Sequence, residues 1–270
     1  MTPQRWHPGT LLETSGYFWK TCTLHAAVKL DVFTVIGEDR LAAEDIAARA
    51  GADADAMARL LDALTAMELT EKENGKYFNT EDAAKYLSRN SPDYMGYMIM
   101  HHHFLVDYWR RLDESVKTGN PVREPEAGDD ETWKNDAERE AFLMGMFNIA
   151  SLTAPQLVAG VDLEGRRRLL DMGGGPGTYA IHFCRKYPEL KATIFDLPTS
   201  RPFAEKTVAG FGMTDRIGFK DGDFLAQELP GGYDVVFMSH ILHGEGYDAC
   251  RRMIRKAWRA MEEGGMIIIS

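Results

Sequence analysis

The stretch Leu169-Leu170-Asp171-Met172-Gly173-Gly174-Gly175-Pro176-Gly177-Thr178 decides the fold of this 270-residue chain. The apolar run 168–172 is typical of a buried parallel strand, and a helical pattern follows over 179–187. A strand, a glycine turn and a helix in this order form the entry of a nucleotide-binding α/β unit. The glycines allow a sharp turn and a close approach to a ligand that any Cβ would obstruct, and unpaired N–H groups of the helix point at that ligand.

The glycine spacing and the acid before it favour a cationic ligand. A dinucleotide-binding GxGxxG pattern would need glycine where Thr178 stands. Asp171 at the end of the strand would repel a pyrophosphate and attract an amino group or a sulfonium. This combination resembles the first motif of S-adenosylmethionine-dependent methyltransferases; the alternative is a glycine-rich turn that binds no cofactor.

Composition limits the classes of partner. The formal net charge of -10 disfavours nucleic acid, whose binding requires clustered Lys and Arg. Cys22, Cys184 and Cys250 are odd in number and far apart, which suggests neither a disulfide framework nor a zinc site. No signal core and no apolar run of membrane-spanning length is evident. We therefore expect a cytoplasmic protein that binds neither nucleic acid nor membrane.

The N-terminal third reads as a winged helix. Helical patterns over 10–36, 41–50 and 54–67 precede a hairpin over 69–78 around Asn74-Gly75. This arrangement could bind DNA, but the segment from residue 41 to residue 90 contains only six basic residues and ten acidic ones. A module for dimerisation or packing is therefore the favoured interpretation.

The middle of the chain is mainly helical. The region 91–119 is rich in Met and aromatic residues, which are usually core, and 120–131 reads as a surface loop. His101, His102 and His103 diverge by about 100° per residue on a helix, so they cannot bind one metal ion together. The helix expected over 138–160 carries Phe142 and Met146 on one face.

Four further strands are expected in the second half, over 191–195, 216–220, 233–238 and 266–269, with a helix over 249–261. Acidic residues follow two of them. Asp196 lies about 20 positions beyond the glycine turn, where a carboxylate accepts ribose hydroxyls. Asp223 could accept from an adenine amino group while Phe224 covers the ring. The sequence thus predicts an α/β fold with a Rossmann-like parallel sheet.

Motifs after the glycine turn identify a family by resemblance. FDLP at 195–198, GDF at 222–224 and SHILH at 239–243 resemble, in order and spacing, those of small-molecule O-methyltransferases of the caffeate, hydroxyindole and bacterial polyketide type. The resemblance implies a winged-helix-like dimerisation domain, a class I methyltransferase domain and S-adenosyl-L-methionine as cofactor. The residues it assigns to the cofactor are Asp171, Gly173, Gly175, Gly177, Asp196, Leu197, Asp223, Phe224 and Ser239.

The same resemblance assigns the acceptor side of the site. His243 would be the general base, since a histidine with a pKa near 6.5 is suited to take the proton of a phenol with a pKa near 10. His102, Phe142 and Met146 would contact a small aromatic or polyketide-like hydroxyl compound. No metal is expected, because the pair of His240 and His243 lacks a convincing third ligand.

The resemblance also divides the chain and shows where it departs from the family. We expect a winged-helix-like domain over 1–100, a helical connector with acceptor-pocket residues over 101–164, and the cofactor domain over 165–270. The fold would be truncated after the fifth strand, before a glutamate that orients the histidine. Ser239 replaces a lysine of the plant members, and Gly244-Glu245 replace Asp-Trp.

These observations leave three hypotheses for the function. The first is an O-methyltransferase that works as a homodimer through its N-terminal helices. The second is a methyltransferase-like protein that binds the cofactor or a partner with impaired catalysis. The third, a transcription regulator, is disfavoured by the acidic winged helix.

Overall fold

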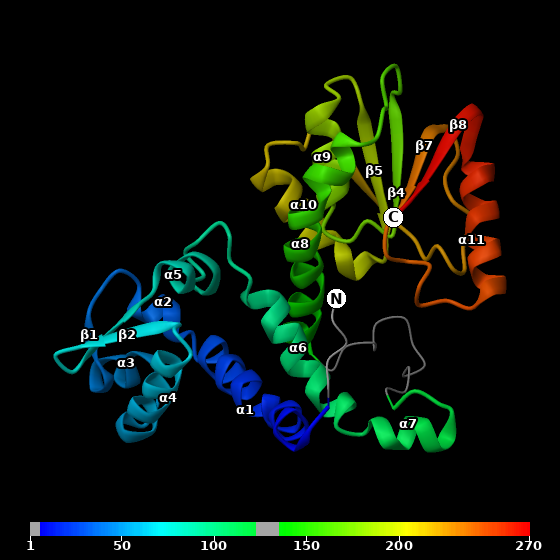
Figure 1. The fold of residues 1–270 in the computed structure, drawn as a ribbon. Helices are drawn as coiled ribbons and strands as arrows, with labels where there is room; N and C mark the ends of the chain where they lie inside the picture. Colours follow the sequence, from blue (N-terminus) through cyan, green and yellow to red (C-terminus); the bar gives the residue numbers. More distant parts are fainter. Residues whose placement is uncertain (1–5, 123–134) are drawn as a thin grey trace. The chain divides into compact units, whose positions relative to one another are not determined.

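A computed structural model describes residues 6–122 and 135–270. The chain forms two compact units, Met1–Pro125 and Glu126–Ser270, which we describe separately (Figure 1). The loop expected over 120–131 lies mostly outside the described residues. The three-part division at residues 100 and 164 stays a prediction.

The first unit is helical with a small antiparallel sheet, as the winged-helix interpretation requires. The sheet has the order β1-β3-β2, and Asn74-Gly75 connect β2 to β3. Both residues have positive φ angles, of 50° and 78°, as a tight hairpin turn requires. The elements are α1 (Pro8–Lys29), α2 (Val32–Ile36), β1 (Leu41–Ala42), α3 (Ala43–Ala50), α4 (Ala54–Ala66), β2 (Thr70–Glu73), β3 (Lys76–Asn79), α5 (Glu81–Leu87), α6 (Gly96–Trp109) and α7 (Leu112–Thr118).

Two helices expected in this unit are interrupted. The predicted helix 10–36 ends at Lys29 and resumes at Val32, because Asp31 adopts a left-handed conformation with φ of 56°. Aspartate is among the few residues that tolerate this region. The expected region 91–119 likewise divides into α6 and α7. Apolar periodicity continues across both breaks, so it did not reveal them.

The second unit contains a five-stranded parallel sheet with helices on both faces (Figure 1). The strand order β6-β5-β4-β7-β8 places β4, which precedes the glycine turn, at the centre. The elements are α8 (Asp136–Ala159), β4 (Arg168–Met172), α9 (Thr178–Lys186), β5 (Lys191–Asp196), η1 (Pro198–Ser200), α10 (Arg201–Gly210), β6 (Ile217–Asp221), β7 (Tyr233–Met238), α11 (Tyr247–Ala260) and β8 (Met261–Ile269). The Rossmann-like fold class predicted from the sequence is confirmed.

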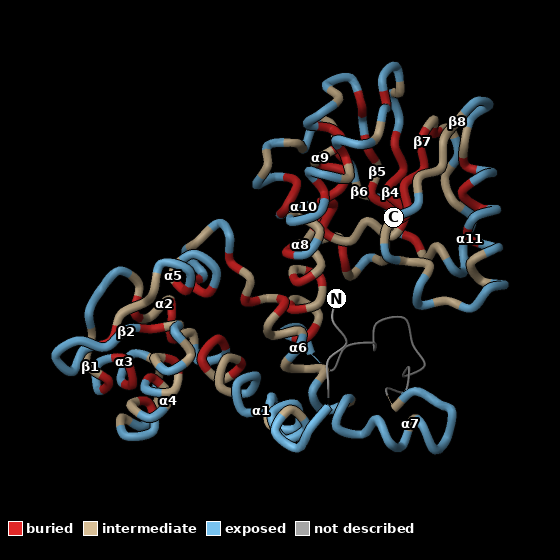
Figure 2. Tube along the Cα trace, viewed as in Figure 1, coloured by how far each residue is buried: buried red, intermediate tan, exposed pale blue. Residues whose placement is uncertain are grey.

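The central strand is buried on both faces, which explains its continuous apolar run. Leu169 packs in one cluster with Phe183 of α9, and Leu170 packs in another with Met253 of α11. All four side chains are at most 1% exposed, and β4 and its neighbour β7 are mostly buried (red in Figure 2). The buried sheet fixes the carboxyl ends of its strands at one edge.

Two elements of this unit differ from expectation. The helix α10 is not among the predicted elements, and β8 begins at Met261 rather than Met266, with an irregular register opposite Tyr233 and Val235. Within the described residues β8 is an edge strand of the sheet.

The helix α8 corrects the expectation that no apolar run reaches membrane-spanning length. Its 24 residues are long and apolar enough by length and composition, and within the described ranges it is the one helix that meets this criterion. Ala154 and Val158 of α8 are nevertheless core residues of the second unit, and the rings of Phe147 and Phe211 lie 6.2 Å apart. The apolar character of α8 is therefore used at least in part for packing against the protein.

Candidate cofactor site

The expected cofactor residues meet at the carboxyl edge of the parallel sheet. Met172, the last residue of β4, lies opposite Phe195 of β5 and Met238 of β7, and Asp196 lies opposite Asp221 of β6. The ends of these strands and the segments that follow them carry the cofactor residues assigned by resemblance. Open α/β sheets bind ligands in the crevice at this edge.

Protein side chains leave no room for a Cβ at two glycines of the turn. Gly173 has φ of 68°, and a Cβ there would lie 2.7 Å from Cγ2 of Ile241. Gly177 has φ of 80°, and its Cβ would overlap Cδ1 of Ile194. Gly175 has φ of 50°, yet no described atom lies within 4 Å of its Cβ position. At 173 and 177 the protein itself therefore excludes a side chain. The close approach of a ligand to the three glycines stays a prediction.

Asp196 is held against the glycine turn by three hydrogen bonds. Its Oδ2 accepts from the backbone N–H of Gly175 at 2.7 Å. Its Oδ1 accepts from the N–H of Leu197 at 2.7 Å and from the hydroxyl of Ser200 at 3.1 Å. Burial raises the pKa of this carboxyl, and the three donors oppose the rise. The carboxylate predicted for the ribose thus lies directly beside the turn.

Asp171 lies beneath the turn with only 2% of its surface exposed. Its carboxyl packs on Gly174, where a Cβ would come within 2.6 Å of Cγ, and it accepts a hydrogen bond from the N–H of Ala180. Oδ2 has no hydrogen-bond partner among the described residues. Burial, reinforced by the charge of Asp196, raises the pKa of this carboxyl to about 7, against the effect of the Ala180 N–H.

The loop after β6 places an aromatic ring over the turn. Cε1 of Phe224 would lie 3.1 Å from a Cβ at Gly173, beside Ile241. Asp223 uses Oδ1 to accept from the N–H of Leu225 at 2.7 Å, which stabilises the loop. Ser239 directly follows β7, and its hydroxyl oxygen is buried without a hydrogen-bond partner in the described part of the chain.

His243 lies in the exposed loop between β7 and α11. Its ring centroid is 6.2 Å from that of His240, whose N–H donates to the carbonyl of Ser270 at 3.1 Å. The thiol of Cys250 donates to the carbonyl of Leu242 at 3.3 Å and so ties the loop to the first turn of α11. The role of His243 as base stays a prediction.

The acceptor residues assigned by resemblance lie on two helices. Phe142 and Met146 are half-buried on α8 of the second unit, and His102 is exposed on α6 of the first unit. Their contacts with an acceptor stay predictions. The neighbouring His103 instead packs edge-on against His25 of α1, with ring centroids 5.5 Å apart.

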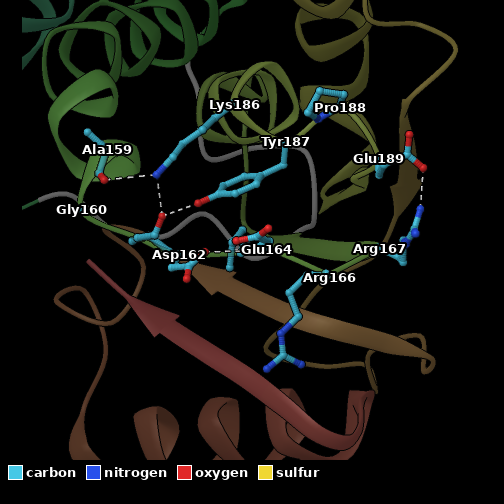
Figure 3. Close-up of a pocket in the computed structure, with 13 residues that line it drawn as sticks. Ala159, Gly160, Asp162, Glu164, Arg166, Arg167, Lys186, Tyr187, Pro188 and Glu189 are labelled. Atoms are coloured by element: carbon cyan, nitrogen blue, oxygen red, sulfur yellow. Dashed lines mark hydrogen bonds and ion pairs between the residues drawn. The ribbon is translucent and has the colours of Figure 1, made fainter.

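A hollow of about 560 Å³ lies at the opposite edge of the sheet in the second unit (Figure 3). Lys186 donates there to the carbonyls of Val158, Ala159 and Val161 at 2.8 to 3.1 Å. Tyr187 also donates to Val161, at 2.6 Å. These bonds join the end of α8 to α9, so the hollow is a helix junction remote from the strand ends that carry the cofactor residues.

The residues at the carboxyl edge fit S-adenosylmethionine. The buried oxygens of Asp171 and Ser239 lack partners in the described ranges, as expected of groups that await a polar ligand. The carboxylates of Asp171, Asp196 and Asp223 suit a ligand with a positive charge and several hydroxyl and amino donors. Two residues that contact the candidate site were not singled out in the sequence: Ser200, which donates to Asp196, and Ile241, the apolar centre of SHILH, which lies against Gly173.

Comparison with known proteins establishes the family. The model of the O-methyltransferase domain matches residues 109–270, and that of the O-methyltransferase dimerisation domain matches residues 12–89. The chain belongs to the S-adenosylmethionine-dependent O-methyltransferase family.

Individual relatives match nearly the whole chain. A 3-hydroxy-5-methyl-1-naphthoate 3-O-methyltransferase of Streptomyces sahachiroi is 37% identical over 99% of this chain and 78% of its own. The tetracenomycin polyketide synthesis 8-O-methyl transferase of Streptomyces glaucescens is 31% identical over 97% of this chain and 78% of its own length. The crystal structure of human N-acetylserotonin methyltransferase in complex with S-adenosylmethionine superimposes with a TM-score of 0.85, at 25% identity over 100% of this chain and 81% of that one.

Proposed function

We propose that this protein methylates a hydroxyl group of a small aromatic or polyketide-like molecule. The observation that carries the proposal is the fixed Asp196 carboxylate beside a glycine turn, with further polar groups along the same sheet edge. The two Streptomyces relatives are named as O-methyltransferases of a naphthoate and of a polyketide, which supports this class of acceptor. Both names are those of enzymes, which favours catalysis over cofactor binding alone.

Each part of the site has a proposed task. Asp196 and Leu197 would hold the ribose, Asp223, Phe224 and Ser239 the adenine, and Asp171 with the glycine turn the charged methionyl end. The cofactor supplies the methyl group as a sulfonium. The chain's own contribution is to align donor and acceptor and to exclude water.

His243 would act on the acceptor. A phenol is a poor nucleophile until its proton is removed, and a neutral imidazole can take that proton as the hydroxyl oxygen attacks. His102, Phe142 and Met146 would contact the acceptor, with the apolar surface of α8 suited to a flat, hydrophobic molecule.

Methyl transfer from labelled S-adenosylmethionine to a panel of naphthols and phenols tests the proposal. We expect transfer to at least one aromatic hydroxyl, and a fall in kcat of about 10²- to 10⁴-fold for His243→Ala, as for loss of a general base. The affinity for S-adenosylhomocysteine should not change in this variant. His240→Asn is the matched control, because it alters a histidine of the same loop whose φ of 54° asparagine tolerates. An unchanged rate in His243→Ala would remove the role of His243.

The assembly and location belong to the same proposal. The dimerisation-domain match indicates a dimer, and we infer that the N-terminal helices form its contact. A cytoplasmic location is supported by three free cysteines, Cys22, Cys184 and Cys250.

A further inference from the structure

A buried lysine on α11 contacts the loop that carries Asp223 and Phe224. Only 9% of the surface of Lys256 is exposed. Its Nζ donates to the carbonyl oxygen of Phe224 at 2.9 Å and to that of Leu225 at 2.7 Å. Burying an ammonium group costs free energy unless such partners replace its water. The backbone of the loop therefore satisfies the buried charge.

The two carbonyls belong to a tight turn that orients the adenine-side residues. The N–H of Gln227 donates to the carbonyl of Asp223, and the N–H of Leu225 donates to its Oδ1, both at 2.7 Å. The ring of Phe224 lies over Gly173. A displacement of this turn would therefore move the ring and the carboxylate together.

We infer that Lys256 is a positioning residue for the adenine side of the cofactor site. The inference rests on the proposed function, in which Asp223 and Phe224 bind the adenosyl group. Lys256 acts through these two residues, because its Nζ is engaged with the loop backbone. Without the ammonium group, two backbone carbonyls lose a charged donor and the loop is less ordered. Binding of the ligand must then order the loop, which lowers the affinity.

Calorimetry with S-adenosylhomocysteine and steady-state kinetics test this inference. Lys256→Met, which keeps the unbranched apolar stem but removes the charged amino group, should raise the Kd about tenfold, as expected for a lost hydrogen bond to a charged group. At saturating S-adenosylmethionine, kcat and the acceptor KM should stay within about twofold, since the acceptor side is untouched. Lys256→Arg should restore most of the affinity. Arg255→Met, an exposed neighbour on the same helix, is the matched control and should leave the Kd unchanged.

Hydrogen exchange separates positioning from a general loss of stability. In Lys256→Met the amides of Leu225 and Gln227 should exchange faster, while amides of β4 keep their protection. If Lys256→Met does not fold, Lys256→Gln, a shorter neutral donor, should raise the Kd about threefold.

Two results would overturn the inference: an unchanged Kd in the folded variant, or an equal rise in Arg255→Met. Failure of the wild type to bind S-adenosylhomocysteine would instead contradict the proposed function. In that case, amide exchange at Leu225 and Gln227 would still show whether Lys256 holds the loop. If these amides exchange equally fast in Lys256→Met and in the wild type, Lys256 does not order the loop.

Discussion

Asp171 is buried at the end of β4 with one carboxyl oxygen that no described residue satisfies. Its pKa of about 7 lies above the ordinary value near 3.9 because burial disfavours the charged form. The folded protein therefore binds this proton more tightly than the unfolded chain. The stabilisation is fully present below about pH 4 and is lost as the pH rises through 7.

Asp171→Asn should remove this pH dependence. Between pH 5 and pH 8 the wild type should lose about 2 to 3 kcal/mol of unfolding free energy from this group, which the variant should not lose. Burial lowers the pKa of three histidines, His25, His103 and His182, and their contribution to the unfolding free energy therefore rises with pH. Because this opposes the effect of Asp171, the pH dependence of the wild type alone does not isolate the effect of Asp171. The measurement is the difference between variant and wild type in urea unfolding at both pH values.

The matched control is Asp215→Asn, which alters an exposed carboxylate. It should parallel the wild type. If Asp171→Asn also parallels the wild type, Asp171 does not hold a raised pKa in the folded state.

At the scale of elements, the turn from β4 to α9 offers a comparison of two glycines. Gly177→Ala and Gly175→Ala both place a side chain at positive φ, which costs about 1 kcal/mol. Only at 177 does the new Cβ overlap Ile194 in the core. We therefore expect Gly177→Ala to lose at least about 2 kcal/mol more unfolding free energy than Gly175→Ala, measured by urea denaturation. Equal losses would contradict the packing described for this turn.

The strands were predictable because their signals are local. The limits of β4 and β7 were predicted to the residue, since continuous apolar runs end at glycine or polar residues. The break between α1 and α2 was not predicted. It occurs because Asp31 adopts a left-handed conformation, and the spacing of apolar residues gives no sign of such a conformation. The helix α10 was overlooked although Pro202 in its first turn is a recognised start signal.

The acidic residues of the candidate site could be predicted from the sequence, but the lysine that holds its loop in place could not. Strand order brings Asp171, Asp196 and Asp223 to one edge, and this placement was predictable because each lies at or just beyond the carboxyl end of a predicted strand. Lys256 could not be found this way, because a lysine on a basic amphipathic helix is ordinarily exposed. Its burial follows from a contact with a loop more than thirty residues away.

At the scale of the whole molecule, the exposed apolar side chains of α1 predict the dimer contact. Leu12, Phe18 and Trp19 are all exposed, with Trp19 at 69%. Trp19→Asp should convert the protein from dimer to monomer in light scattering after gel filtration, because it places a charge in the inferred contact. Trp258→Asp on α11, an equally exposed tryptophan, is the control and should remain dimeric. A dimer in both variants would exclude the α1 surface around Trp19 as an essential contact.

The most direct test of the whole account is calorimetry of S-adenosylhomocysteine with wild type and Asp196→Asn. Asparagine keeps the shape of the side chain but removes the charge that accepts the ribose hydroxyls, so we predict one site per chain in the wild type and a Kd raised about tenfold or more in the variant. Absence of binding to the wild type, or equal affinity in both proteins, would contradict a cofactor site at the carboxyl edge of the sheet.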